Sequence, residues 1–131
     1  MKLKSKKLIS FDIEVYGGKL VFSYGHDSQT ILDLLSDGEL TSNRMILHIA
    51  ESFEEHELLT NPNSGVTFSD GHFTLIALPF HTDIPQLANT VAHEVFHAVH
   101  KILRERGLKL TNASEEAYAY LTGYITEKLW N

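Results

Sequence analysis

The 131-residue chain contains no cysteine. This absence excludes disulfide bonds, thiolate zinc sites and cysteine nucleophiles together. No apolar run approaches the roughly 18 residues that a membrane span requires. The chain also lacks internal repeats, low-complexity tracts and linkers, and its hydrophobic share of 43% is ordinary for a globular protein. The length therefore predicts one domain over residues 1–131.

Basic residues are fewer than acidic ones. Eleven Lys and Arg stand against 17 Asp and Glu, which gives a net charge of −6. Such a surface repels nucleic acid as a whole, and the only basic cluster, within residues 2–7, is interpreted as a solvated tail. Asp12 and Glu14 interrupt the apolar stretch that follows too early for a signal peptide. We therefore expect no nucleic-acid partner, no membrane partner and a cytoplasmic location.

Two segment pairs have the alternating pattern of β-hairpins. Residues 8–15 and 19–24 alternate apolar and polar positions around a Gly-Gly pair. Residues 66–69 and 72–78, which read VTFS and HFTLIAL, flank an Asp-Gly pair that gives the stronger hairpin signal. Between the two hairpins, a short helix is predicted at QTILDLLS. A second helix is predicted within residues 42–58, although MILHI in that range is also compatible with a strand.

Two long helices are predicted after the second hairpin. Thr82 or Asp83 caps the first, which has a proline in its first turn and runs to about Arg106. Asn112, with a glutamate three residues later, resembles a capping box that opens a last helix to about Trp130. An order of strands followed by two long helices predicts an α+β fold.

The first of these long helices contains the sequence H-E-V-F-H. Residues i and i+4 lie on one helix face about 6 Å apart along the axis, so His93 and His97 can point their imidazoles at one ion. Glu94 follows at about 100° of rotation, where a carboxylate can take a proton from a metal-bound water. The apolar residues of the helix cluster on the opposite arc, so the pair is not part of the apolar stripe. Solvated histidines on an ordinary amphipathic helix are the alternative.

A catalytic zinc site needs a third protein ligand and one open position. The candidates are Glu115 and Glu116 at the start of the last helix. The short connection makes the two long helices antiparallel neighbours. Glu116 shares its side of the helix with Gly123, and Ala119 is also small, so we expect this side to pack against the histidine helix. This argument favours Glu116, whereas the alternative is that both acids are first-turn residues favoured by the helix dipole.

H-E-V-F-H followed by a glutamate 19 residues after the second histidine resembles the gluzincin branch of the zincin metallopeptidases. The segment SEEAYAYLTGYI and the compact size are similar to the minimal zincin-like proteins encoded by phages and prophages. The resemblance covers about residues 67–130 and is thin over 1–60. The chain departs from the large gluzincins because it has no second domain and lacks their N-E-x-x-S-D pattern around the third ligand.

The resemblance implies a zincin-like domain, with a small antiparallel or mixed β-sheet packed on the H-E-V-F-H helix and on a C-terminal glutamate-bearing helix. It implies Zn²⁺ as the cofactor, with His93, His97 and Glu116 as its ligands. Glu94 is implied as the general base of a metallopeptidase that cleaves peptide bonds. The alternative function is a catalytically silent binding or regulatory protein on the same scaffold.

The resemblance also implies where substrate binds. The strand before the active helix, residues 72–78, is expected to be a sheet edge that binds an extended peptide or protein substrate. Tyr120, Tyr124 and His81 are candidates for stabilising the oxyanion or orienting a ligand, and packing is the alternative role of the two tyrosines. For a phage-encoded protein, the expected location is the cytoplasm of the host cell.

Overall fold

A computed structural model describes residues 1–131 and contains four strands and four helices. The strands are β1 (Lys7–Asp12), β2 (Lys19–Tyr24), β3 (Val66–Ser69) and β4 (Phe73–Leu78). The helices are α1 (Ser28–Asp37), α2 (Asn43–Glu55), α3 (Ile84–Glu105) and α4 (Glu115–Trp130). The α+β class, both hairpins and all four helices are confirmed, and the segment with two readings, MILHI, is helical. None of these helices combines the length and apolar character needed to cross a membrane.

The four strands form one mixed sheet in the order β1-β2-β4-β3. The pairs β1–β2 and β3–β4 are antiparallel hairpins, whereas β2 and β4 are parallel. Parallel pairing needs a long crossover, which the segment with α1 and α2 provides. β4 is therefore paired on both sides, and the prediction that residues 72–78 form an edge is wrong. The free edge beside α3 belongs to β3.

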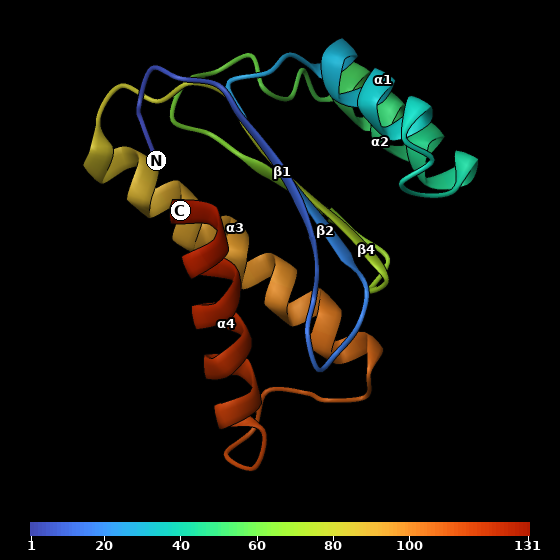
Figure 1. Cartoon of the computed structure of the whole chain (residues 1–131), viewed down its shortest axis with the longest axis vertical. Helices are drawn as coiled ribbons and strands as arrows, with labels where there is room; N and C mark the ends of the chain where they lie inside the picture. Colours follow the sequence, from blue (N-terminus) through green and yellow to red (C-terminus); the bar gives the residue numbers. More distant parts are fainter.

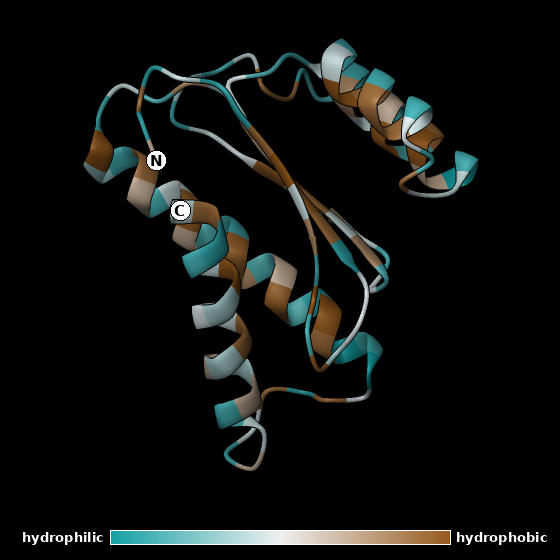
Figure 2. Ribbon diagram, viewed as in Figure 1, coloured by the Kyte–Doolittle hydropathy of each residue, from teal (hydrophilic) through white to brown (hydrophobic).

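Helices cover both faces of the sheet, with α1 and α2 on one face and α3 and α4 on the other (Figure 1). Leu20 and Phe22 of β2 join the apolar cluster under α3 and α4, whereas Val21 joins the cluster under α1 and α2. In β4, Ile76 joins the cluster under α3 and α4, and Leu75 joins the cluster under α1 and α2. The strands are accordingly hydrophobic over much of their length, while the helices alternate between hydrophobic and hydrophilic sides (Figure 2). This pattern is expected for strands buried on both faces.

Aspartates define the first residues of two helices. The Asp27 carboxylate accepts a hydrogen bond from the Thr30 N–H at 2.8 Å, which holds the pKa of Asp27 below its ordinary value. Asp83 accepts from the Gln86 N–H at 2.8 Å and so begins α3. Each bond satisfies one of the free N–H groups at the start of a helix.

The capping box predicted at Asn112 is wrong, because α4 begins after Ser114 and has no side-chain cap. The Ser114 hydroxyl is used inside the preceding loop instead. It accepts a hydrogen bond from the Thr111 N–H at 3.0 Å and donates to the Lys109 carbonyl. This local network sets the start of α4 without Asn112.

Arg106, directly after α3, joins both hairpin turns to the end of that helix. Its guanidinium donates to the carbonyls of Tyr16 at 2.8 Å and Gly17 at 3.0 Å in the β1–β2 turn. It also donates to the Gly71 carbonyl in the β3–β4 turn. A planar group with five N–H donors can hold three carbonyls at once, which an ammonium cannot do with the same geometry.

We expect Arg106→Lys to lower the free energy of unfolding by about 1–3 kcal/mol, because at least one carbonyl in a partly buried turn loses its donor. Equilibrium urea unfolding measures this change. Arg44→Lys, at an exposed position on α2, is the matched control and should stay within about 0.5 kcal/mol of the wild type. Equal stability of the two variants would contradict the role assigned to Arg106.

Candidate metal centre

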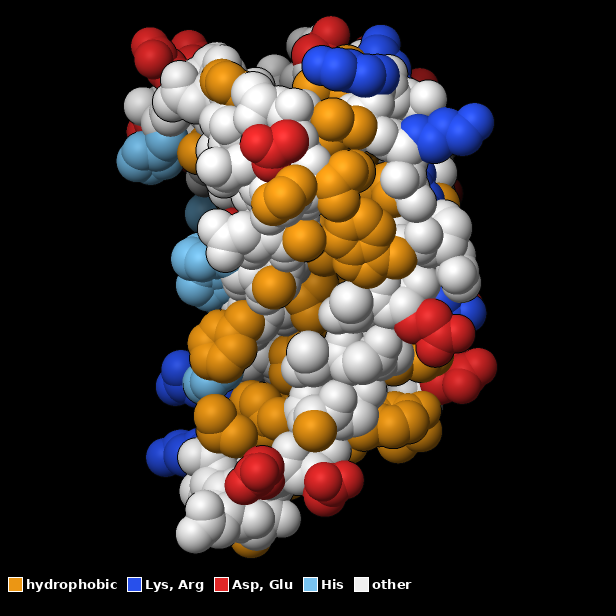
Figure 3. Space-filling view, turned by 90° about the vertical axis from the view of Figure 1, so that its left-hand side faces the viewer, with side chains coloured by type: hydrophobic (Ala, Val, Ile, Leu, Met, Phe, Trp, Pro, Cys, Tyr) orange, Lys and Arg blue, Asp and Glu red, His pale blue; other side chains and the backbone are white.

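The apolar stripe of α3 decides which of its residues reach solvent. Val91, Val95 and Ile102 are buried against the sheet and α4. His93 and His97 lie on the opposite side of the helix and are exposed. Figure 3 shows histidine side chains, followed by basic ones, along the left border of this face of the molecule. The histidine pair therefore forms part of a solvent-facing ridge, with β3 and α4 on its two flanks.

The imidazoles of His93 and His97 converge. Their Nε2 atoms are 3.1 Å apart, and their ring planes meet at 79°. Two nitrogens bound to one tetrahedral zinc ion at about 2.0–2.1 Å are roughly 3.3 Å apart. The separation of the pair is close to that of two ligands of one zinc ion, and it is also that of a hydrogen bond between the two rings. Four-residue spacing within a single helix is sufficient to produce it.

Glu94 is buried beside this pair, with an exposed fraction of 5%. One carboxylate oxygen, Oε1, accepts a hydrogen bond from the Thr67 hydroxyl at 2.8 Å. The other, Oε2, lies 3.8 Å from Nε2 of His93. A carboxylate held by one oxygen and aimed by the other at the histidine pair is placed for proton transfer next to an ion. Sequence reasoning missed Thr67, because a contact between β3 and α3 has no local sequence signal.

A cavity of about 290 Å³ opens next to Glu94 and His93. Its other walls come from the loop at residues 63–65 and from Asn89 and Thr90 of α3. Asn63 fixes this loop through hydrogen bonds with Thr82. Its Oδ1 accepts from the Thr82 N–H at 3.0 Å and from the Thr82 hydroxyl at 3.2 Å, and its Nδ2 donates to the same hydroxyl at 3.1 Å.

Gly65 lets this loop approach α3 closely. A Cβ atom at residue 65 would lie 2.9 Å from Cγ2 of Thr90 and 3.0 Å from Cγ of Glu94. The residues Asn61–Gly65 predict a loop, but nothing in their sequence predicts that the loop forms a wall of the site.

His81 lies behind this cavity, with an exposed fraction of 1%. Its Nε2 is 2.8 Å from the Thr90 hydroxyl, and its Nδ1 is 2.9 Å from the Pro79 carbonyl. Because both ring nitrogens have partners inside the core, His81 does not face a substrate, and the predicted oxyanion role does not fit. Its contact with Thr90, which lines the cavity, is compatible with an orienting role.

Tyr120 and Tyr124 lie on the side of α4 that faces β1. The Tyr124 hydroxyl donates to the Asp12 carbonyl at 3.1 Å, and its ring packs edge-on against Phe11. Tyr120 stacks on Tyr124 and is 48% exposed. Neither ring contacts His93 or the cavity, so packing, the alternative role, describes both tyrosines.

Glu116 points away from α3. The buried side chains of α4 are Tyr118, Leu121, Ile125 and Leu129. Glu116 is exposed and precedes Tyr118 by two residues, or about 200° of rotation. A Cβ added at Gly123 would meet nothing within 4 Å, so the side with the small residues is open. The predicted packing side is wrong, because burial of the large apolar stripe stabilises the helix more than close approach at small residues.

The position of α4 along α3 also separates the glutamates from the histidine pair. Tyr118 packs on His100, with ring centroids 5.3 Å apart, and α4 runs back along α3 from there (Figure 1). Glu115 and Glu116 precede Tyr118 and so lie beyond this contact as seen from His97. No three histidine, aspartate or glutamate side chains are grouped so that they could hold a metal ion. His93 and His97 therefore stand as a pair with the separation of two zinc ligands, and Glu116 does not join them as a third in this arrangement.

Comparisons of the chain with protein families, with curated proteins and with solved structures find no match. A function for the chain is therefore inferred from the geometry of its own residues.

We expect Thr67→Val to lower the free energy of unfolding by about 1–3 kcal/mol, because the buried Glu94 carboxylate loses the hydroxyl that donates to it. Thr67→Ser retains the hydroxyl and is the matched control, with a smaller loss from the missing methyl group. Equilibrium urea unfolding at neutral pH compares the two. If Thr67→Val is as stable as Thr67→Ser, the hydrogen bond does not hold Glu94.

Proposed function

We propose that the chain is a zinc-dependent hydrolase of the zincin type, and specifically a metallopeptidase. One observation carries this proposal: the Nε2 atoms of His93 and His97 converge at 3.1 Å on an exposed ridge, directly beside the buried carboxylate of Glu94. Solvated histidines on an amphipathic helix have no reason to be accompanied by a buried, hydrogen-bonded acid. A buried ionisable group beside a cavity is instead typical of functional sites.

Each of the three residues has a distinct role in this reaction. His93 and His97 would hold a zinc ion through their Nε2 atoms. The ion would supply a Lewis acid that polarises a carbonyl and lowers the pKa of a water molecule to roughly 7. Glu94 accepts the proton of the attacking water at Oε2 and delivers it to the leaving amine, while Thr67 holds Oε1. Burial of Glu94 keeps bulk water from competing for that proton.

The free edge of β3 is the proposed binding site for the substrate. β3 has no strand partner on one side and lies along α3, with Thr67 in contact with Glu94. An extended peptide that adds to this edge forms main-chain hydrogen bonds with β3 and passes beside the histidine ridge. β3 thus takes the role that the sequence assigned to residues 72–78, and a peptide or protein stays the proposed partner.

One observation favours the alternative, a catalytically silent binding or regulatory protein on this scaffold. Catalytic zinc sites usually have three protein ligands, and Glu116 points away from the histidine pair. Turnover separates the two functions, because a silent protein retains peptide binding without cleavage. The cytoplasmic location expected from the sequence stays a prediction.

We expect purified wild-type protein to retain about one zinc ion per chain after gel filtration, as measured by mass spectrometry. His93→Ala and His97→Ala should lose this zinc, because each removes one of two converging imidazoles. His100→Ala is the matched control on the same helix and should retain it. A wild-type protein that binds no supplied zinc would exclude the metal site.

Glu94→Gln tests the proton-transfer role. We expect this variant to retain zinc and to lower kcat on any cleaved peptide by about 10²–10⁴-fold, because the amide cannot accept the proton. Thr67→Ser should retain most of the activity. Full activity in Glu94→Gln would show that another group accepts the proton.

Glu115→Gln and Glu116→Gln test the third ligand. Because Glu116 points into solvent and both residues lie beyond the Tyr118–His100 contact, we expect neither variant to change the zinc stoichiometry. Loss of zinc in Glu116→Gln alone would show that α4 moves to complete the site, as the resemblance to gluzincins implies.

A further inference from the structure

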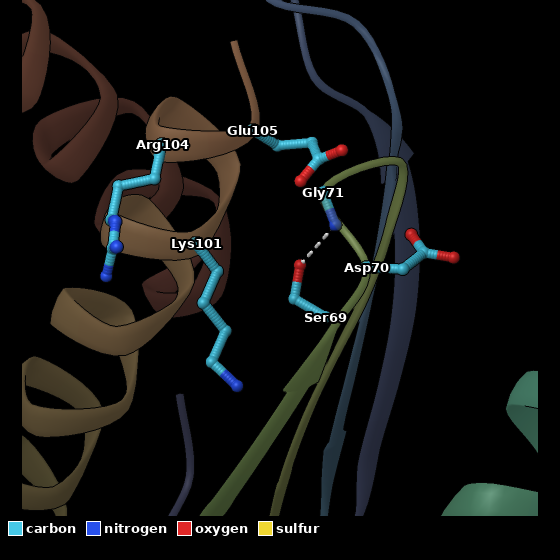
Figure 4. A pocket seen from close by; sticks show the side chains of 6 residues that line it. All are labelled: Ser69, Asp70, Gly71, Lys101, Arg104 and Glu105. Carbon is cyan, nitrogen blue, oxygen red and sulfur yellow. Dashed lines mark hydrogen bonds between the residues drawn. The ribbon is translucent and has the colours of Figure 1, made fainter. Parts of the chain in front are cut away.

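A second cavity lies at the far end of β3, where the β3–β4 turn meets the last turns of α3. Its volume is about 420 Å³. Its walls are formed by three residues of the turn and three of the helix, which are Ser69, Asp70, Gly71, Lys101, Arg104 and Glu105 (Figure 4). All of these residues are polar or glycine, so the cavity suits a hydrophilic or charged group.

The two cations of this cavity have no anionic partner. The ion pairs of the chain are Lys19–Asp12, His56–Glu55 and His93–Glu94, and none includes Lys101 or Arg104. No hydrogen bond uses either side chain, and Figure 4 shows both extending from α3 away from the two carboxylates. Lys101 and Arg104 are therefore two neighbouring cations outside any ion pair, in a cavity whose lining also contains the carboxylates of Asp70 and Glu105.

The two acids of the cavity are directed to the turn. Oδ1 of Asp70 accepts hydrogen bonds from the N–H groups of His72 at 2.8 Å and Phe73 at 2.7 Å. The Glu105 side chain lies across Gly71, with its Cγ 2.3 Å from the place where a Cβ of residue 71 would stand. The Asp70 carboxylate is therefore bound by the backbone of the turn, and the Glu105 side chain lies against Gly71. Neither acid forms an ion pair with the ammonium or guanidinium group, which stay available to a ligand.

The distance along α3 from the histidine pair to this cavity can be expressed in residues of an extended peptide. Lys101 follows His97 by four residues and Arg104 follows it by seven, which is about 6 Å and 10 Å along the helix axis. β3 runs in the same direction, because Thr67 contacts Glu94 and Ser69 shares the cavity with Lys101. An extended peptide advances about 3.3 Å per residue. A peptide on the β3 edge therefore reaches the two cations roughly two to three residues from the bond beside His97.

We infer that Lys101 and Arg104 form a substrate subsite that binds a carboxylate two to three residues from the scissile bond. This inference rests on the proposed function, which it deepens by assigning acidic peptides as the substrate class. The carboxylate comes from an aspartate or glutamate side chain, or from the C-terminus of a short peptide. Arg104 binds such a group through a planar pair of N–H donors, and Lys101 adds a second positive charge.

Cleavage of a mixed peptide library by the zinc-loaded protein tests the inference, with products read by mass spectrometry. We expect aspartate or glutamate to be enriched at one position two to three residues from the cut. Lys101→Glu/Arg104→Glu should lower cleavage of these peptides about tenfold or more, because two charge-assisted contacts become repulsive. Lys2→Glu/Lys4→Glu is the control. It makes the same change in net charge at two exposed residues that precede β1, and it should leave the preference unchanged.

Cleavage of the same library, prepared once with free and once with amidated C-termini, tells whether the carboxylate belongs to a side chain or to the C-terminus. A preference that persists after amidation identifies a side-chain carboxylate, whereas one that disappears identifies the terminal carboxylate. Cleavage without any acidic preference, or with a preference that Lys101→Glu/Arg104→Glu retains, overturns the subsite and leaves the peptidase proposal intact.

A binding arm separates failure of the subsite from failure of the proposed function. Zinc-loaded Glu94→Gln is applied to an array of the same peptides, and the Lys101→Glu/Arg104→Glu change is added to it for comparison. Acid-dependent binding that this change removes supports the subsite even if the wild type cleaves nothing, which is the result expected of a silent binding protein. If the protein neither binds nor cleaves any peptide of the library, both proposals are overturned.

Discussion

The burial of one side of α3 against the mixed sheet is the constraint on which the candidate site depends. Each fully buried Val or Ile of this stripe contributes about 1.5–3 kcal/mol, so the rotation of α3 about its axis is strongly determined. With Val91, Val95 and Ile102 in the core, His93 and His97 must face solvent. Glu94, at an intermediate angle, is carried to the border of the core and under the end of β3. The positions of all three polar residues thus follow from the packing of their apolar neighbours.

Glu94 is the residue that apolar packing alone does not explain. A carboxylate removed from water destabilises the fold unless hydrogen bonds compensate, and here Thr67 supplies one such bond. An alanine or leucine at this position would suit the stripe better. Departures of this kind from local packing rules are expected where a residue serves function, which is why the proposal depends on Glu94 together with the histidines.

The edge of β3 connects the two cavities of this side of the molecule. The strand has only four residues, and its short length limits unwanted pairing with other chains. One end of β3 lies beside Glu94 and the wall at Gly65, and the other end lies beside Lys101 and Arg104. The proposed reaction centre thus lies at one end of this strand edge and the proposed acidic subsite at the other. The net charge of the protein does not suggest the proposed substrate class, because it averages over surfaces far from this edge.

The sequence by itself determined the features that arise within single elements. Hairpin spacing, a cap at Thr82 or Asp83 and helical periodicity were sufficient for the element order. They were also sufficient to bring His93 and His97 together, because residues four apart on one helix are neighbours wherever that helix packs. Only the tertiary structure decided the pairing of β4 between two strands, the contact of Thr67 with Glu94 and the outward direction of Glu116. The first two are contacts between elements far apart in the sequence, which have no local signal. The direction of Glu116 was open because α4 has small residues on one side and large apolar ones on another, and helical periodicity does not tell which side is buried.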